Sequence, residues 1–334
     1  MGNEIGRALR SLLAMIGGMT LLAVAAIGTP AQSDEFPSRA ITVIVPFPPG
    51  GSSDIVMRLV AQKVSESIQQ PIIIDNRPGG AGNLAAMVIK NAPPDGYLLM
   101  MGHTGTHAVN PSLYHDLKFD PIKDFAPITA LIAFNNILVV PAASPAKSVA
   151  ELIAFARTRP DGLNYGSQGI GTGGHLLGEL LAKHAGVKLV HVPYRGIAPA
   201  VTDTVAGRMD FLFSSYISAA GHIESGKLRM LAIAGPQRHP RIPDVPTMAE
   251  AGYPDVEMQQ WFGLFAPADT PMPVVRKLNA EFVKALQSED LKEKLLPQVA
   301  FIIPGSPEDL AAMVARDMVR LGEVVRGAGA KAPE

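Results

Sequence analysis

The chain has 334 residues, of which 47% are hydrophobic, enough for a large core shared by two domains. Its 29 basic and 30 acidic side chains give a formal net charge of −1, and cysteine is absent. The absence of cysteine excludes disulfides, thiol nucleophiles and Cys-ligated metals. The near-zero net charge and the lack of a basic patch interleaved with aromatic residues argue against a nucleic-acid partner.

The first 31 residues have the pattern of a secretory signal peptide. Arg7 and Arg10 precede an apolar run over 12–27, and small residues follow at Thr29-Pro30-Ala31. A membrane anchor is the alternative, but the run is shorter than the ~20 residues that a span needs. We therefore predict a signal peptide over 1–31 and export to the periplasm.

Residues 41–64 predict a buried strand, a sharp turn and an amphipathic helix. The apolar run 41–45 suits a strand covered on both faces. Prolines and glycines over 46–51 turn the chain, and Ser52, Ser53 and Asp54 offer helix N-caps. The helix N-terminus beside small glycines is suited to an anion, carboxylates included, although it also fits an ordinary strand–helix connection.

Strand-like and helix-like segments then alternate, which predicts an α/β fold with mostly parallel sheets flanked by helices. We expect strands at 71–75, 97–101, 163–167, 189–193, 210–213 and 228–234, and helices at 81–90, 149–157, 175–185, 198–207 and 217–226.

Two long extended runs, 131–140 and 261–267, bracket a self-contained α/β block. This pattern predicts two lobes joined by two crossover segments. Lobe 1 is expected over 36–135 plus 259–330, with helices at 273–286 and 307–325, and lobe 2 over 136–258.

A second glycine-rich turn over 164–175 also follows a strand and opens a helix, with Ser167 or Thr172 as a possible cap. Two such turns, one in each lobe, would face each other across a cleft. The spacing of Gly169, Gly171 and Gly174 matches a dinucleotide fingerprint, but the next strand lacks the acidic residue that this fingerprint needs. We therefore predict no cofactor.

The histidines do not predict a metal site. His103 and His107 are four residues apart, but Gly102 and Gly105 favour a loop there, and no HExxH pattern is present. The hydroxyls of Thr104 and Thr106 in this loop would line the cleft.

Signals for hydrolytic chemistry are absent. Neither serine-containing turn matches Gly-x-Ser-x-Gly, and no pair of carboxylates has catalytic spacing. Arg195 either binds a carboxylate through two hydrogen bonds or is an ordinary solvated loop arginine.

Together these motifs resemble the tripartite tricarboxylate transporter receptors, also called Bug proteins, from position 36 to the final helix. The matching pieces are VPFPPGGSSD, DNRPGGAGN, PDGYLLMMGHTGTHAVNPSLY, DPIKDFAPI, SVAELIAFA, LNYGSQGIGTGGHL, VPYRGIAPAVTD, IPDVPTMAEAGYP and WFGLFAPADTP.

The resemblance implies a periplasmic binding protein of the type II-like, two-lobe kind, which closes on a small organic acid. It also implies a ligand shell drawn from both turns and the cleft wall: Phe47, Gly50, Gly51, Ser52, Asp54, Thr104, Thr106, Ser167, Gly171, Thr172, His175 and Arg195.

One position departs from the family pattern. The resemblance implies Asp-Asn after the strand at 210–213 in many members of the family. In this chain Ser214 and Ser215 occupy that place, followed by Tyr216. An Asp there could pair with a ligand ammonium. We therefore include Ser214 and Ser215 in the site and expect a ligand with an uncharged or aromatic body.

The expected function is a non-enzymatic, monomeric receptor for a di- or tricarboxylate or an aromatic acid. The alternatives are an exported hydrolase or lyase acting on a carboxylate, and a sensor subunit. The expected protein partners are the membrane subunits of a tripartite transporter or a sensor kinase.

Overall fold

The computed structural model describes residues 36–330, so the predicted signal peptide lies outside the described residues. By its chain contacts, Arg39–Glu334 forms one compact unit, separate from Met1–Ser38. Among the described residues, no helix combines the length and the apolar character required to cross a bilayer.

The first sheet has six strands in the order β11-β4-β10-β3-β1-β2. Its strands are β1 (Ile41–Val45), β2 (Ile72–Asn76), β3 (Leu98–His103), β4 (Phe125–Asn135), β10 (Gln259–Pro267) and β11 (Ala300–Ile302). β1 pairs in parallel with β2 and β3, whereas β10 runs antiparallel to β3 and β4, and β11 runs antiparallel to β4. We call this sheet and its helices lobe 1.

The second sheet has five strands in the order β7-β6-β8-β5-β9. Its strands are β5 (Ile137–Pro141), β6 (Leu163–Ser167), β7 (Leu189–Pro193), β8 (Phe211–Ser214) and β9 (Leu228–Ile233). β6 pairs in parallel with β7 and β8, and β5 runs antiparallel to β8 and β9. We call this sheet and its helices lobe 2.

The predicted α/β layers are confirmed, but both sheets are mixed rather than mostly parallel. Strand–helix alternation predicts parallel neighbours only within a βαβ unit. The chain enters the second sheet at β5 and returns to the first sheet at β10, in both cases without such a helical connection. Each of these two strands is antiparallel to both of its neighbours.

The helices follow the predicted apolar spacing closely. They are α2 (Ser52–Ile68), α3 (Asn83–Lys90), α4 (Asn110–Leu113), α5 (Val149–Arg157), α6 (Gly173–Ala185), α7 (Ile197–Val205), α8 (Tyr216–Glu224), α9 (Met272–Leu286), α10 (Glu289–Leu295) and α11 (Pro307–Ala328). Short 3-10 turns occupy Gly80–Gly82 (η1) and Leu296–Gln298 (η3). The loop expected around Gly105 is instead a π-helical turn, η2 (Gly105–Val109).

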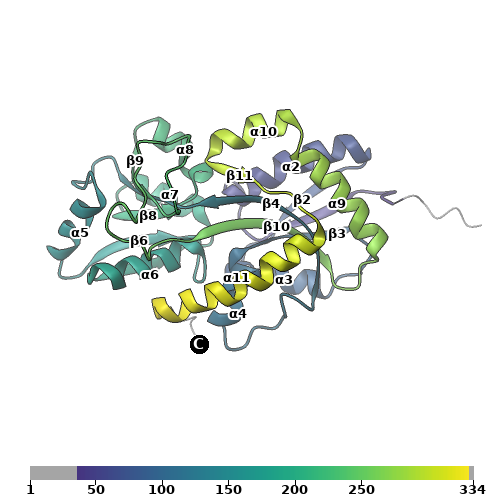
Figure 1. Cartoon of the computed structure of the whole chain (residues 1–334), viewed down its shortest axis with the longest axis horizontal. Coiled ribbons are helices and arrows are strands. Elements are labelled where there is room, and N and C mark those ends of the chain that lie inside the picture. The colour runs from purple at the N-terminus through teal and green to yellow at the C-terminus, as the bar shows by residue number, and fades with distance from the viewer. Residues whose placement is uncertain (1–35, 331–334) are drawn as a thin grey trace, which may run out of the picture. The chain divides into compact units, whose positions relative to one another are not determined.

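Two crossover segments connect the lobes, as predicted. β4 leads through a single residue, Asn136, into β5, and β10 returns the chain to lobe 1 beside β4. Figure 1 shows β4 and β10, paired strands of the first sheet, running toward the second sheet. The last helix, α11, contacts β4 and η2 of lobe 1 and also α6 of lobe 2.

The core is continuous across the lobes. One buried cluster includes Ile44 and Met100 from lobe 1 together with Leu138 and Tyr165 from lobe 2. Burial of each large apolar side chain contributes about 1.5–3 kcal/mol, so this shared cluster stabilises the region where the two lobes meet.

Candidate functional site

The first turn, residues 46–51, joins β1 to α2 and ends at Gly51, the N-cap of α2. No side chain caps this helix, contrary to the predicted Ser or Asp cap. Asp54 instead stabilises the turn that precedes the helix, since its carboxylate accepts the Gly50 N–H at 3.0 Å. Arg58 and Asn76 also donate to this carboxylate, at 2.9 and 3.0 Å.

The electrostatics of Asp54 fit this structural role. Burial alone would raise the pKa of its carboxyl, but hydrogen bonds from Arg58, Gly50 and Asn76 outweigh burial and lower the pKa. The carboxylate is buried and fully engaged, so it holds the geometry of the first turn.

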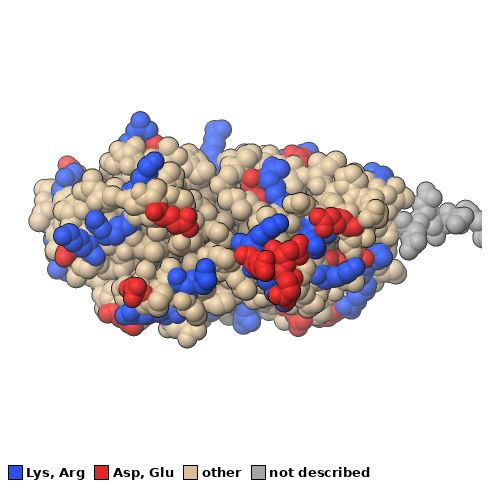
Figure 2. All heavy atoms as spheres, turned by 90° about the horizontal axis from the view of Figure 1, so that it is seen from above, with Lys and Arg blue, Asp and Glu red and all other residues tan. Residues whose placement is uncertain are grey.

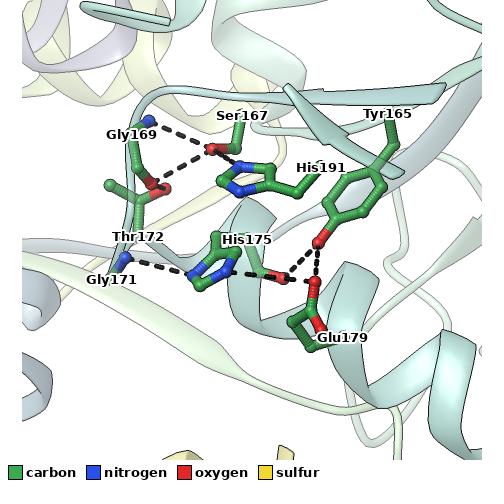
Figure 3. Close-up of polar contacts among 8 residues, drawn as sticks. All are labelled: Tyr165, Ser167, Gly169, Gly171, Thr172, His175, Glu179 and His191. Atoms are coloured by element: carbon green, nitrogen blue, oxygen red, sulfur yellow. Dashed lines mark hydrogen bonds and ion pairs between the residues drawn. The ribbon is translucent and has the colours of Figure 1, made fainter. Parts of the chain in front are cut away.

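The second turn, residues 168–172, joins β6 to α6, and its own side chains fold it tightly (Figure 3). Thr172, at the N-cap position, donates its hydroxyl to the carbonyl of Gly169 at 2.7 Å. The Ser167 hydroxyl accepts the Gly169 N–H at 3.1 Å. His175 Nδ1 accepts the N–H of Gly171 at 3.2 Å.

Two stacked histidines support this turn from lobe 2. The rings of His175 and His191 lie 4.2 Å apart, and His191 Nε2 is 2.6 Å from the Ser167 hydroxyl (Figure 3). Tyr165 donates its hydroxyl to Glu179 at 2.6 Å, and Glu179 lies 4.0 Å from His175 Nε2.

Both imidazoles are neutral near pH 7. Burial, with the neighbouring His175, lowers the pKa of His191 to about 3, and burial lowers the pKa of His175 against the opposing effect of Glu179. Because Nδ1 of His175 accepts a hydrogen bond, it must be unprotonated in this arrangement. The second turn therefore depends on two uncharged histidines.

A third strand–helix junction, from β8 to α8, completes the interlobe region. The Ser52 N–H at the start of α2 donates to the Ser218 hydroxyl of α8 at 3.0 Å. The hydroxyls of Ser215 and Ser218 lie 3.0 Å apart. The serines of lobe 2 therefore contact the helix N-terminus of lobe 1 directly.

These junctions surround a small cavity, the inner chamber, of about 10 Å³. It is lined by Ser52, Phe134, Asn136, Gln168, Gly174, Ile197, Phe213, Ser214 and Ser215. Four of these residues lie at the N-termini of α2, α6, α7 and α8. Helix N-termini carry partial positive charge and unpaired N–H groups, and no ionisable side chain is among the described residues that line the chamber.

A larger hollow, the outer cleft, has a volume of about 560 Å³. Its walls are the rings of Phe47, Tyr114 and Tyr194, together with Arg195 and the turn backbone. Gln168 lines both hollows, so the two adjoin. Within the described part of the chain, no ion pair engages Arg195, which leaves its guanidinium available to an anionic group in the cleft.

The predicted site residues fall into three groups. Phe47 and Arg195 line the outer cleft, and Ser52, Ser214 and Ser215 line the inner chamber. A second group builds and braces the turns without lining either hollow: Gly50, Gly51, Asp54, Ser167, Gly171, Thr172 and His175.

Thr104 and Thr106 form the third group, because neither lines either hollow. Both are fully buried. The Thr104 hydroxyl accepts the Trp261 N–H at 2.8 Å, and the Thr106 hydroxyl donates to the His103 carbonyl at 3.0 Å. The Thr104 hydroxyl thus bonds to β10 and the Thr106 hydroxyl to the end of β3, so we leave both residues out of the proposed ligand shell.

The sequence prediction missed Asn136, Gln168, Tyr194 and Ser218. Asn136 had a visible signal, because a polar pair interrupts the long apolar run 131–140. Gln168 is the first residue of the second turn. The position of Ser218 depends on how α8 packs against α2, which no local pattern in the sequence encodes.

Among the described residues, neither the surface charge on the face in Figure 2 nor a cluster of metal-ligating side chains marks a binding site. Over the face drawn in Figure 2, Lys and Arg are interspersed with Asp and Glu, so local groups must provide the attraction for an anion. In the described segment, 36–330, no group of three or more His, Asp or Glu side chains could hold a metal ion.

The fold and the converging helix N-termini are those of a two-lobe α/β binding protein. The chain matches the family model "Tripartite tricarboxylate transporter family receptor" over residues 56–329, and it belongs to that family.

Known relatives match nearly the whole chain. A protein from Pseudomonas sp. strain P51, encoded in the tcbD-tcbE intergenic region, is 40% identical over 96% of this chain and 94% of its own. Rpa4515 of R. palustris, solved with adipate, is 37% identical, with a TM-score of 0.86 over 89% of this chain and 99% of its own. MatC of Rhodopseudomonas palustris, solved with malate, is 36% identical, with a TM-score of 0.83 over 87% of this chain and 100% of its own.

Proposed function

We propose that this protein is a periplasmic solute receptor that captures a small organic carboxylate between its lobes and delivers it without chemical change. The observation that carries this proposal is the convergence of four helix N-termini on the inner chamber, with no ionisable side chain lining it. Backbone N–H groups with partial positive charge suit a carboxylate, and they need no metal or cofactor.

The two hollows suggest how the ligand lies. Its carboxylate would occupy the inner chamber, and its body would pass Gln168 into the outer cleft between the rings of Phe47 and Tyr194. Arg195 would hold a second acid group. Solved relatives with adipate and malate support a ligand of this class.

Capture requires the lobes to move. A chamber of about 10 Å³ is near the size of one water molecule, which is too small for a carboxylate. The lobes would part about β4 and β10, admit the acid and close on it with the chamber wider than it is in this structure. The lobe boundaries for this motion are proposed at 36–135 plus 259–330 and at 136–258.

The contact between Ser167 and His191 raises the alternative of a hydrolase. A serine and a histidine 2.6 Å apart resemble a nucleophile and its base. However, Ser167 has no exposed surface, and its hydroxyl is already bonded to the backbone of Gly169. We therefore assign the pair to support of the second turn, and we propose that the receptor has no enzymatic activity.

The partners follow from the family. We propose that the closed receptor, as a monomer, docks on the membrane subunits of a tripartite transporter, with a sensor kinase as the alternative. Copurification of the ligand-bound receptor with candidate membrane subunits distinguishes these two.

A thermal-shift panel of mono- and dicarboxylates, including adipate and malate, tests the capture. Because the ligand binds only the folded form, at least one acid should raise Tm, by the equivalent of ~2.7 kcal/mol at a hundredfold excess over Kd. Amides of the same acids, which lack the charge, are the matched control. A Tm that no acid changes would contradict the proposal.

Lobe motion can be followed separately because the chain has no cysteine. Gln62 of lobe 1 and Asp161 of lobe 2 are exposed, so Gln62→Cys and Asp161→Cys accept spin labels at defined places. The bound acid should narrow the distance distribution between the labels. An unchanged distribution, despite a raised Tm, would refute closure.

A further inference from the structure

A third cavity lies against the crossover strands and shares no lining residue with the inner chamber or the outer cleft. We call it the hinge cavity, and its volume is about 390 Å³. Ala133 and Asn135 of β4 line it, whereas Phe134 and Asn136 line the inner chamber. Because side chains alternate along an extended strand, the two cavities occupy opposite faces of the same crossover.

The lining of the hinge cavity is mainly apolar and includes rings. Phe301, Ile303 and Met313 come from lobe 1, and Ile233 and Pro236 come from lobe 2. An engineered apolar cavity of about 150 Å³ binds benzene, so 390 Å³ accommodates one substituted or fused ring. Phe301 and the thioether of Met313 offer favourable contacts to such a ring.

The charges around this cavity are already satisfied. Arg238, which lines it, donates to Glu250 at 2.9 Å and to the Pro243 carbonyl at 3.0 Å. Burial lowers the pKa of His239, which is therefore neutral near pH 7. No acidic side chain is among the described residues that line it. The cavity thus offers no unpaired charge to the carboxylates that suit the inner chamber.

The walls of the cavity cross from one lobe to the other. The rings of His239 in lobe 2 and Phe301 in lobe 1 lie 4.9 Å apart. Beside Phe301, Val299 is buried in a cluster whose other members all belong to lobe 2, such as Ile137 and Val245.

Val299 also has a φ of 56°, a left-handed conformation that is strained for a β-branched residue. Strain of this kind persists only where the surrounding packing enforces it. The segment that carries Phe301 is therefore held against lobe 2 by packing, so the two walls of the cavity have a defined spacing.

We propose that the hinge cavity is a second binding site, for a small uncharged aromatic molecule, and that its occupant favours the closed lobes. Because the hinge cavity lies on the opposite face of the crossover from the inner chamber, lobes that part at the chamber approach each other at the hinge cavity. An occupant between Phe301 of lobe 1 and Pro236 of lobe 2 fills the space that would have to narrow, and so it opposes opening. By thermodynamic linkage, such a molecule raises the affinity of the main site for its acid, and the acid raises the affinity of the hinge cavity.

The binding test uses 4-fluorophenol, which is uncharged at pH 7 because phenols have a pKa of about 10. We expect saturable broadening of its ¹⁹F resonance with the wild-type protein. Ile303→Trp, which fills the cavity, should lose this saturable binding. Ile122→Trp is the matched control, since Ile122 is 55% exposed and outside the cavity, and it should bind as the wild type does.

Three results would overturn the site: linear, unsaturable broadening, equal binding by Ile303→Trp, or loss of binding in both variants. An unchanged Tm of Ile303→Trp shows that its fold is intact. The test therefore does not depend on the proposed carboxylate function.

The coupling is measured with the spin-labelled Gln62→Cys/Asp161→Cys protein in the absence of acid. Saturating 4-fluorophenol should shift the lobe-to-lobe distances toward those of the closed form, and Ile303→Trp should abolish the shift. An unchanged distance distribution at saturation would overturn the coupling.

Discussion

The backbone N–H of Ser52 donates to the hydroxyl of Ser218 at 3.0 Å, and this bond joins the first turn of α2 to α8 across the interlobe region. The N-terminus of α2 therefore does two things. It offers partial positive charge to the inner chamber, and it anchors lobe 1 to lobe 2.

Removal of the Ser218 hydroxyl tests the anchoring role. A neutral hydrogen bond contributes about 0.5–1.5 kcal/mol net. Ser218→Ala should therefore favour open lobes and weaken carboxylate binding roughly two- to tenfold in isothermal titration calorimetry. Ser225→Ala is the control, because its hydroxyl bonds only within its own helix end, to the His222 carbonyl. Equal affinities in the two variants would show that the bond does not stabilise closure.

Gly51 tests the close approach of the lobes. Its φ of −85° suits any residue, but a Cβ there would lie 3.1 Å from Ile197 of lobe 2. Gly51→Val should impair closure and lower carboxylate affinity while Tm without ligand stays near that of the wild type. Gly221→Val, whose Cβ meets nothing within 4 Å, is the control. Gly171 is less suitable, because its φ of +84° would strain any substitute.

Stability should fall as the pH drops from 7 to 5. Burial lowers the pKa of His103 to about 4 and that of His107 to about 3. Both stay neutral in the folded state, while in the unfolded chain they take up protons below about pH 6.5. Their contribution is therefore complete above pH 6.5 and is lost toward the folded pKa, at roughly 2 kcal/mol for each histidine by pH 5.

Urea unfolding at pH 7 and pH 5 measures this loss. His107→Leu should reduce the loss between pH 7 and pH 5 by its own share, roughly 2 kcal/mol, and the exposed-site variant His115→Asn should leave the loss unchanged. Asp54 does not interfere, because its lowered pKa places its own titration below the unfolded value of 3.8. A wild-type stability that is equal at both pH values would contradict this account of the buried histidines.

The buried contact between Trp261 and Asp317 should stabilise the crossover. The Trp261 indole N–H donates to Asp317 at 2.9 Å, and both residues are buried. Asp317→Ala leaves this donor unpaired, which should lower the free energy of unfolding by roughly 1–3 kcal/mol. The chain has one Trp, so its fluorescence in urea reports the change directly. The exposed-site control, Asp269→Ala, should unfold as the wild type does; a matching curve for Asp317→Ala would refute the role.

Local patterns in the sequence predicted the repeating part of the fold. The apolar spacing of α2 and the alternation of strands and helices required no knowledge of distant contacts. The antiparallel entry of β5 and β10 was not predictable in this way, because strand direction depends on which distant strand lies next to it. The π-helical turn at Gly105–Val109 likewise depends on packing against α11.

The two turns of the candidate site were predicted from the sequence, whereas the directions of their side chains were not. The two glycine-rich turns were visible because their composition is local. The sequence could not show that the Asp54 carboxylate accepts the Gly50 N–H of the first turn, or that the Thr104 hydroxyl bonds to β10. Both outcomes depend on the direction of a side chain within a packed interior. Ser218 joined the site only because α8 packs against α2.

The central claim is that the α2 N-terminus binds the carboxylate through its backbone, and Ser52→Pro tests it directly. Ser52 is the first residue of α2, where proline preserves the helix but removes the N–H, and the extended Gly51 before it accepts a proline. Ser52→Ala keeps the N–H and loses only the hydroxyl.

Isothermal titration calorimetry with the acid that gives the largest thermal shift compares the two variants in a Ser218→Ala background, so that neither variant keeps the Ser52–Ser218 bond that joins the lobes. A hydrogen bond to a charged group contributes about 1.5–3 kcal/mol, so Ser52→Pro should bind roughly 10- to 150-fold more weakly than Ser52→Ala. Equal affinities in the two variants would contradict the claim.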